Sequence, residues 1–241
     1  MEFIWPGPVP RGGQFFLIKP RRTGVFLGRP ISVAGWEVSG TGAILRFLVA
    51  RRGQGSRELV DLRPGEEAEL IGPLGNYWAL LDIPEGPVAL VGGGIGIAPL
   101  LAFALELGEK PRNHVLFDIY AGFRTGSFGL DDIKSRTPGL RSLIIATEDG
   151  SLGVKGRIPD FFTPSGYSAV CACGPEPMLR VVGDSCIAAG VPCYISVEKH
   201  MACGVGACLG CTVRTTRGNR QCCTDGPIFN AQEIVFDNKR T

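Results

Sequence analysis

The sequence predicts a β plus α/β multidomain fold, with an antiparallel β-barrel, a parallel-sheet α/β domain and a small C-terminal β-rich lobe. Three observations along its 241 residues favour this fold. Short β-rich runs separated by turn residues come first, strands alternating with helices follow, and glycine and cysteine dominate the end. The expected division is 1–84, 85–196 and 197–241.

The first division is interpreted as an antiparallel barrel because its apolar runs are short and no convincing helical period occurs before residue 84. Gly, Pro and Ser turns separate these runs. Strands are expected at Phe15–Ile18, Ile31–Val33, Ala43–Ala50 and Glu67–Ile71. The stretch before Phe15 is expected to lack most of a first barrel strand.

A change of pattern at Pro84-Glu85-Gly86-Pro87 marks the second division. Strands then alternate with helices, which favours a parallel sheet with crossover helices. Expected strands are Val88–Val91, Val115–Tyr120, Leu143–Ala146 and Ala169–Cys173, and expected helices are Gly96–Leu107 and Glu176–Ala189, the second ended by Gly190. In the last division, short strands are expected at Thr212–Thr215 and Ile234–Phe236.

Charge and hydropathy limit the partners of the chain. Its 25 basic and 23 acidic residues are spread evenly and give a net charge of +2, so no nucleic-acid or membrane surface is expected. The longest apolar stretches, such as Ile95–Leu105, are too short to span a bilayer. A soluble protein is expected, and the reducing cytoplasm suits its nine cysteines.

Four cysteines near the end carry the strongest functional signal. The spacing Cys203-x4-Cys208-x2-Cys211, followed by Cys222 or Cys223, is that of a plant-type ferredoxin with a 2Fe-2S cluster. Small residues between the cysteines allow backbone N–H groups to approach the sulfur atoms. The pattern therefore predicts an iron-sulfur protein that moves electrons.

Three alternatives remain for the cysteines: a structural zinc site, a disulfide framework and buried thiols without a role. Zinc sites usually pair two Cys-x-x-Cys knuckles, and only Cys208 and Cys211 make one here. Disulfides suit short secreted chains better than this one. Cys171, Cys186 and Cys193 lie in apolar runs and are interpreted as small core hydrophobes.

Two glycine turns predict a dinucleotide site. Gly92, Gly93, Gly94 and Gly96 follow an apolar strand and open a helix, so backbone N–H groups there could face a pyrophosphate. Cys173, Gly174 and Pro175 occupy the same position after a second strand. One such turn alone is often only a tight connection. Two at the carboxyl ends of strands in one parallel sheet suit a dinucleotide better.

The barrel division offers weaker signals. Arg29-Pro30-Ile31-Ser32 supplies a cation and a hydroxyl, and the turn at Gly53-Gln54-Gly55-Ser56 supplies open amides, both of which suit phosphates but are common in β proteins. A nicotinamide gives two electrons as a hydride and a 2Fe-2S centre takes one, so a flavin is expected between them. With two histidines and no nucleophile-base pattern, no catalytic side chain is predicted.

Together these motifs resemble the ferredoxin-reductase-like electron-transfer subunits of type B dihydroorotate dehydrogenase. The match spans nearly the whole chain and includes Arg29–Ser32, Gly72-Pro73-Leu74-Gly75-Asn76, Val91–Gly96, Thr147–Ser151, Cys173–Met178 and Met201–Cys211. The resemblance implies an FAD-binding barrel, an NAD-binding α/β domain and a 2Fe-2S lobe. It also implies electron exchange between NADH and an FMN-containing catalytic subunit that oxidises dihydroorotate to orotate in pyrimidine biosynthesis, as a heterotetramer with two of each subunit.

The resemblance also assigns residues. It implies FAD contacts from Arg29, Pro30, Ile31, Ser32, Leu48, Val49, Ala50, Gly55 and Ser56, and nicotinamide-nucleotide contacts from the two glycine turns. It places the fourth ligand at Cys223, which precedes Thr224-Asp225-Gly226-Pro227, and leaves Cys222 spare. The residues alone say only that one of these two neighbours points inward. The family usually has an arginine near Ala50 and a threonine at Ser56, so flavin affinity is expected to differ.

Two alternative functions stay open. A reductase subunit of the same fold could serve a hydrogenase, a sulfide-linked enzyme or a ferredoxin-dependent transhydrogenase. A module of another class, stabilised by zinc, could sense nucleotides without redox turnover. The preference for NADH rests on the resemblance, because Arg124 could also meet a 2′-phosphate.

Overall fold

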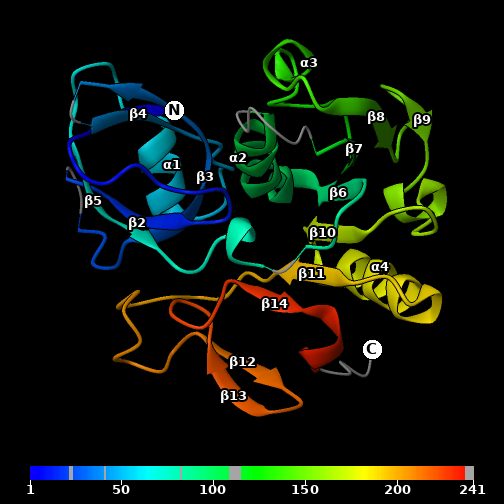
Figure 1. Cartoon of the computed structure of the whole chain (residues 1–241). Coiled ribbons are helices and arrows are strands. Elements are labelled where there is room, and N and C mark those ends of the chain that lie inside the picture. The colour runs from blue at the N-terminus through cyan, green and yellow to red at the C-terminus, as the bar shows by residue number, and fades with distance from the viewer. Residues whose placement is uncertain (22–23, 41, 82, 109–114, 237–241) are drawn as a thin grey trace.

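The computed structural model describes residues 1–21, 24–40, 42–81, 83–108 and 115–236. Its strands form a five-stranded sheet, a seven-stranded sheet and a two-stranded hairpin. In Figure 1 the five-stranded sheet and the seven-stranded sheet stand side by side with helix α2 between them, and the hairpin lies below both. The expected combination of an antiparallel β unit with a parallel α/β unit is confirmed.

The five-stranded antiparallel sheet has the order β1-β4-β3-β2-β5. Its strands are β1 (Glu2–Trp5), β2 (Phe15–Pro20), β3 (Arg29–Ser39), β4 (Gly42–Phe47) and β5 (Ala68–Leu74). Aromatic side chains fill its concave side, where the Phe16 ring meets Trp5 at 5.1 Å and Phe47 at 5.7 Å, both edge to face. These contacts join β1, β2 and β4 into one core.

Two expectations for this sheet were wrong. A first strand is present, since β1 pairs in register with β4 and Trp5 packs on Phe16. The turn expected at Gly53–Ser56 is instead the start of helix α1 (Gln54–Val60). Ser56 Oγ accepts hydrogen bonds from the N–H groups of Arg52 and Gly53, and this local capping begins a helix that two glycines conceal in the sequence.

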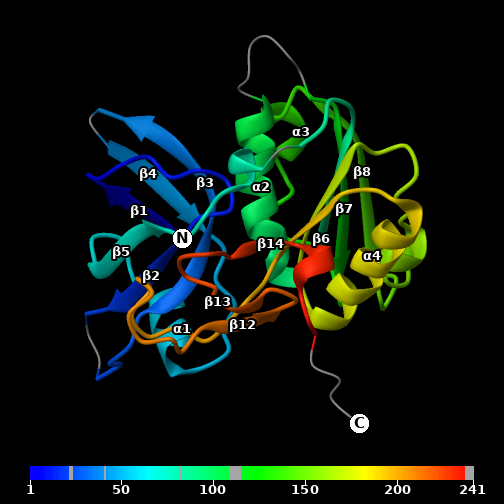
Figure 2. The same cartoon turned by 60° about the horizontal axis from the view of Figure 1, so that its bottom comes forward.

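The seven-stranded sheet has the order β14-β11-β10-β6-β7-β8-β9. Its strands are β6 (Val88–Gly93), β7 (Phe117–Phe123), β8 (Leu140–Thr147), β9 (Val154–Lys155), β10 (Ala169–Cys173), β11 (Cys193–Ser196) and β14 (Ile228–Asn230). Every residue of β6 and β10 is buried, because α2 (Ile97–Gly108) covers one face and α4 (Glu176–Ala189) covers the other (Figure 2). Gly190, with φ of 68°, ends α4 as expected.

Short elements fill the connections. They are the 3₁₀ turns η1 (Trp78–Leu80), η2 (Gly94–Gly96), η3 (Ile158–Phe161) and η4 (Ala231–Glu233), and the helix α3 (Ile133–Arg136). No described helix has the length and apolar character needed to cross a membrane.

The last part of the chain forms the hairpin β12 (Thr212–Thr215) and β13 (Gly218–Gln221) and then adds β14 to the seven-stranded sheet, antiparallel to β11. The expectation of a strand at Ile234–Phe236 was wrong. The chain there comes out of η4, and Ile234 makes only an isolated bridge to Thr215.

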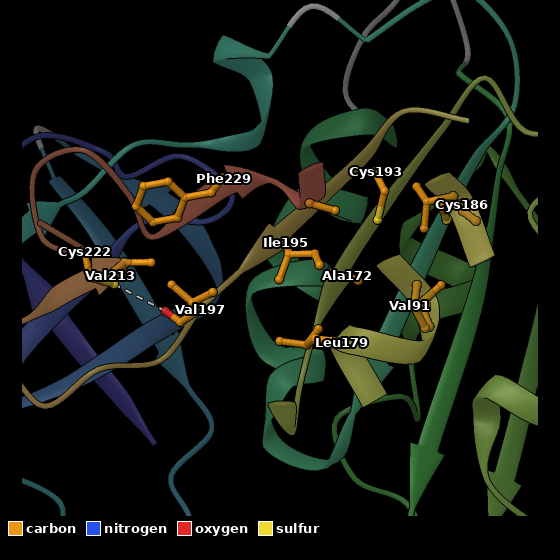
Figure 3. Close-up of a cluster of buried hydrophobic side chains, with 14 of the residues drawn as sticks. Val91, Ala172, Leu179, Cys186, Cys193, Ile195, Val197, Val213, Cys222 and Phe229 are labelled. Atoms are coloured by element: carbon orange, nitrogen blue, oxygen red, sulfur yellow. Dashed lines mark hydrogen bonds between the residues drawn. The ribbon is translucent and has the colours of Figure 1, made fainter. Parts of the chain in front are cut away.

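This lobe shares its core with the rest of the molecule. Figure 3 shows side chains of the lobe, such as Val213 and Phe229, in one cluster with Ile195 and Val91 of the seven-stranded sheet. Phe15 of β2 belongs to the same cluster. The lobe is therefore held by apolar contacts to both sheets.

A half-buried ion pair joins the two larger units. Arg11, which precedes β2, donates to Glu106 of α2, and the Gly12 N–H donates to the same carboxylate at 3.0 Å. Nearby, the rings of Trp78 and Phe103 stack with centroids 5.8 Å apart. These contacts fix α2 against the segment that leads into β2 of the five-stranded sheet, which we call the barrel sheet.

Replacing Arg11 with methionine should destabilise the protein by about 1–3 kcal/mol. The Glu106 side chain is only 8% exposed, so its charge would lose its main partner, while the 44% exposure of Arg11 keeps the loss below that of a fully buried pair. Urea unfolding followed by circular dichroism measures the change. Arg63→Met, at an exposed position, is the control, and equal stability of the two variants would contradict the role of the pair.

Candidate functional site: a cysteine cradle and a nucleotide cavity

The cysteine-rich loop between β11 and β12 lies against the barrel sheet. Gly204, with φ of 70°, is so close to β2 and β5 that a Cβ there would lie 2.8 Å from Leu17 Cδ1 and 2.9 Å from Leu74 Cδ1. Gly206 has φ of 80°, and Leu209 has φ of 57°, which is strained for a residue with a side chain. This winding turns backbone N–H groups toward the cysteine sulfurs.

Two backbone donors reach sulfur atoms in this loop. Gly206 N–H donates to Cys223 Sγ at 3.2 Å, and Cys208 N–H donates to Cys203 Sγ at 3.4 Å. Backbone donors, first that of Val205, lower the pKa of Cys203 to about 6. Burial raises the pKa of Cys223 to about 11, with its hydrogen bond to Cys211 as the second cause.

The four sulfurs form two pairs. The Cys208 thiol is one of the groups that lower the pKa of Cys203, and the Cys211 thiol is one of those that raise the pKa of Cys223. Within the described residues, no group of three or more ligands surrounds a single ion position. Two neighbouring thiol pairs with backbone donors suit a diiron cluster better than one zinc ion, so this donor set fits the 2Fe-2S group.

The side chain of Cys222 points away from the other sulfurs of the lobe. It is fully buried, and its thiol donates to the Val197 carbonyl at 3.4 Å (Figure 3). Burial is the main cause that raises its pKa to about 12. Of the two adjacent cysteines, the structure thus turns Cys223 toward the other sulfurs and Cys222 into the core. None of the nine cysteines, all of them described, is in a disulfide.

The two predicted glycine turns meet at the carboxyl ends of β6 and β10. A Cβ on Gly96 would lie 2.5 Å from the Cys173 carbonyl oxygen, and one on Gly93 would lie 2.7 Å from Pro175 Cδ. A Cβ on Gly174 would lie 2.9 Å from Gly93 N. Only glycines allow the two turns to approach so closely.

A cavity of about 630 Å³ opens above these turns. Gly93, Gly94, Gly174 and Pro175 line it, whereas Gly92, Gly96 and Cys173 lie beneath and support the turns. A Cβ on Gly94 would have no atom within 4 Å, so the turn leaves free space on the cavity side. A glycine turn before a helix and a cavity of this volume fit a nicotinamide nucleotide.

Charged side chains that the motifs did not predict line the same cavity. They are Arg52, Glu148, Arg157, Asp160 and Glu198, in addition to Arg124, which the sequence had suggested. Glu148 lies in the Thr147–Ser151 segment that carries part of the family resemblance, whereas no local pattern identifies the other four as cavity residues. Burial and then the nearby charge of Glu198 raise the pKa of Cys173 to about 12, so its thiol stays protonated at neutral pH.

The barrel residues suggested for FAD lie along β3 and after β4. Arg29 to Ser32 are half-buried at the start of β3, and Leu48 to Ala50 are half-buried just beyond β4. Arg29 donates to the Leu27 carbonyl at 2.7 Å, and a Cβ on Gly55 would lie 2.7 Å from Arg29 Nη2. A fixed cation thus stands beside the first turn of α1, which is a donor set that fits a phosphate.

Comparison with solved structures supports the fold. A chain from the work titled "Insights into flavin-based electron bifurcation via the NADH-dependent reduced ferredoxin-NADP oxidoreductase structure" aligns with a TM-score of 0.77 and 29% identity, over 95% of this chain and 80% of that one. A ferredoxin NADP+ reductase from Neisseria gonorrhoeae with bound FAD and NADP aligns with a TM-score of 0.58 and 19% identity, over 78% and 85%. The fold is therefore that of the ferredoxin reductases.

Sequence relatives are more specific. The family model described as the iron-sulfur cluster binding domain of dihydroorotate dehydrogenase B matches residues 198–235. Two proteins named dihydroorotate dehydrogenase B (NAD(+)), electron transfer subunit, are similar over most of their length. The one from Clostridium perfringens is 44% identical over 93% of this chain and 87% of its own, and the one from Caldanaerobacter subterraneus subsp. tengcongensis is 37% identical over 98% and 92%. Identity at this level over most of both chains shows that the chain belongs to the family of electron transfer subunits of dihydroorotate dehydrogenase B.

Proposed function

We propose that this chain passes electrons between NADH, FAD and a 2Fe-2S cluster, and from there to or from an FMN-containing dihydroorotate dehydrogenase catalytic subunit. The proposal rests on the plant-type ferredoxin spacing of four cysteines, two of whose sulfurs, those of Cys203 and Cys223, accept hydrogen bonds from backbone N–H groups, because this donor set suits an electron-carrying 2Fe-2S cluster. When bound, FAD supplies a carrier that takes two electrons as a hydride and releases them one at a time.

Each part of the chain has its own task in this proposal. Residues 1–84 hold FAD, residues 85–196 hold the nicotinamide nucleotide, and residues 197–241 hold the cluster through Cys203, Cys208, Cys211 and Cys223. Arg29 fixes a flavin phosphate beside Gly55 and Ser56, and Leu48 to Ala50 border the flavin. Cys173 lies buried beneath the turn that is proposed to hold the nicotinamide nucleotide.

The two glycine turns leave no room for larger side chains, and their backbone N–H groups can donate hydrogen bonds to the nucleotide. Gly93 and Gly94 present backbone amides to the diphosphate, while Gly96 lets this turn rest on Cys173 and Gly174. The relatives' names specify NAD(+), and Glu148 in the cavity is consistent with a ribose that carries no 2′-phosphate. NADH is therefore the proposed electron donor.

Anaerobic mixing with NADH tests the proposal. The purified holoprotein should lose both its flavin and its cluster absorption, because each NADH delivers two electrons to carriers in sequence. Absence of bleaching in a preparation that contains FAD and iron would contradict electron transfer from NADH. A colourless preparation with bound zinc would favour the nucleotide-sensing alternative.

Co-purification identifies the partner. We propose a heterotetramer with two copies of each subunit, whose mass native mass spectrometry measures. The named relatives favour the dihydroorotate partner over a hydrogenase, a sulfide-linked enzyme or a transhydrogenase. Recovery of one of those enzymes in place of an FMN-containing dihydroorotate dehydrogenase would overturn the proposed partner but not the electron path within this chain.

A further inference from the structure

Asn76 connects the barrel sheet to the lobe through its backbone and its side chain. It lies two residues after β5, at the end of the segment Gly72–Asn76. Its side-chain Nδ2 donates to the carbonyls of Asp225 at 3.1 Å and Ile228 at 2.9 Å, and its Oδ1 accepts from the Ile228 N–H at 3.0 Å. Its own N–H donates to the Gly226 carbonyl at 2.6 Å. The primary amide thus uses both donors and one acceptor on a single segment.

The segment that Asn76 binds directly follows the proposed ligand Cys223. Asp225 closes a tight turn there, since its carboxylate accepts from Gln221 N–H at 2.7 Å and its N–H donates to the Gln221 carbonyl at 2.8 Å. Cys222 N–H donates to the Cys211 carbonyl at 3.0 Å. A continuous set of hydrogen bonds therefore runs from Asn76 to the backbone around Cys223 and Cys211.

Packing supports the same contact. A Cβ on Gly75, whose φ is 78°, would lie 2.6 Å from Pro227 Cδ and 3.0 Å from the Gly226 carbonyl oxygen. Gln14, just before β2, donates to the Gly75 carbonyl at 3.0 Å. The turn that presents Asn76 is thus fixed from the barrel side and pressed against the lobe on the other.

We infer that Asn76 is a positioning residue, which sets the place of the Cys223 turn, and with it the cluster, relative to the flavin-binding barrel. The inference rests on the proposed function. Strand β5, which ends at Leu74, pairs with β2, and β2 pairs with the Arg29–Ser32 segment proposed to hold FAD. Because electron tunnelling weakens steeply with separation, a looser contact here slows transfer between flavin and cluster.

Asn76→Asp separates this role from simple packing. Aspartate keeps the shape of the side chain but replaces the two N–H donors with an oxygen that faces the Asp225 and Ile228 carbonyls. NADH should reduce the flavin at an unchanged rate, whereas reduction of the cluster should slow by about tenfold. Asn76→Ala should behave in the same direction. Asn219→Ala, on the exposed strand β13, is the matched control and should leave both rates unchanged.

Anaerobic stopped-flow absorbance on the holoprotein measures the rates of flavin and cluster reduction. The content of FAD, iron and sulfide per chain is determined for each variant. The electron paramagnetic resonance spectrum of the dithionite-reduced cluster adds a readout that does not depend on turnover. A shifted spectrum, or loss of iron with FAD and flavin reduction intact, also supports the inference. Normal rates and spectrum in Asn76→Asp overturn it, and so does a variant that loses FAD and fold together. If wild-type protein shows no reduction by NADH, the proposed function fails instead.

Discussion

Replacing Cys223 with serine should remove the iron-sulfur cluster. A serine hydroxyl is a harder and more weakly acidic ligand than a thiol, so the four-cysteine donor set would lose one of its thiolates. The Gly206 N–H that donates to Cys223 Sγ would also lose a thiolate acceptor. Iron and acid-labile sulfide should fall to nearly none per chain, with loss of the cluster absorption, while FAD stays bound.

Cys222→Ser is a matched control one residue away. Its thiol donates to Val197 in the core, and a serine hydroxyl can make the same hydrogen bond, so the variant should keep its iron and lose about 1 kcal/mol of stability. Iron loss in Cys222→Ser with iron retention in Cys223→Ser would show that the ligand assignment is reversed.

Replacing Gly96 with alanine should damage the nucleotide site. The new methyl group would lie 2.5 Å from the Cys173 carbonyl oxygen and 2.6 Å from Gly174 N, and both are backbone atoms that cannot rotate away. The two turns must separate, at a cost of about 1–3 kcal/mol in the free energy of unfolding. Since Gly93, Gly94 and Gly174 line the cavity, NADH affinity should weaken by at least about tenfold, which equals about 1.4 kcal/mol.

Titration of NADH with the flavin as reporter, together with urea unfolding, measures both effects. Gly24→Ala is the control, because a Cβ there meets no atom within 4 Å and its stability should change by less than about 0.5 kcal/mol. Unchanged NADH affinity in Gly96→Ala would show that the nucleotide does not bind at these turns.

Local signals predicted the α/β unit well. The bounds of β10 and α4 match the expected residues, because Gly174, Pro175 and Gly190 mark the strand end, the helix start and the helix end. The cysteine spacing that predicts the cluster is likewise a local signal, because Cys203, Cys208 and Cys211 lie close together in the sequence. The assignment of Cys223 as a ligand, taken from the family resemblance, stays a prediction for the serine variants to test.

Features that depend on distant contacts could not be predicted. Strand β14 has three residues, too few for a period, and exists because Ile228 to Asn230 find the edge of β11. Helix α1 was missed because glycines at 53 and 55 mask a capping interaction made by Ser56. Glu148 and Glu198 reach one cavity from turns about 50 residues apart, and only the folded sheet brings these turns together.

The edge position of β14 also affects how the protein is made. The seven-stranded sheet gains its last strand only after residue 230 has left the ribosome, and the cysteine lobe shares its apolar core with residues translated much earlier. A nascent chain that stops before β14 therefore lacks Phe229, which shares that core with Val213 and Cys222, and the Ile228 backbone that Asn76 binds. The lobe can therefore reach its final packing only after residues 228–230 have paired with β11.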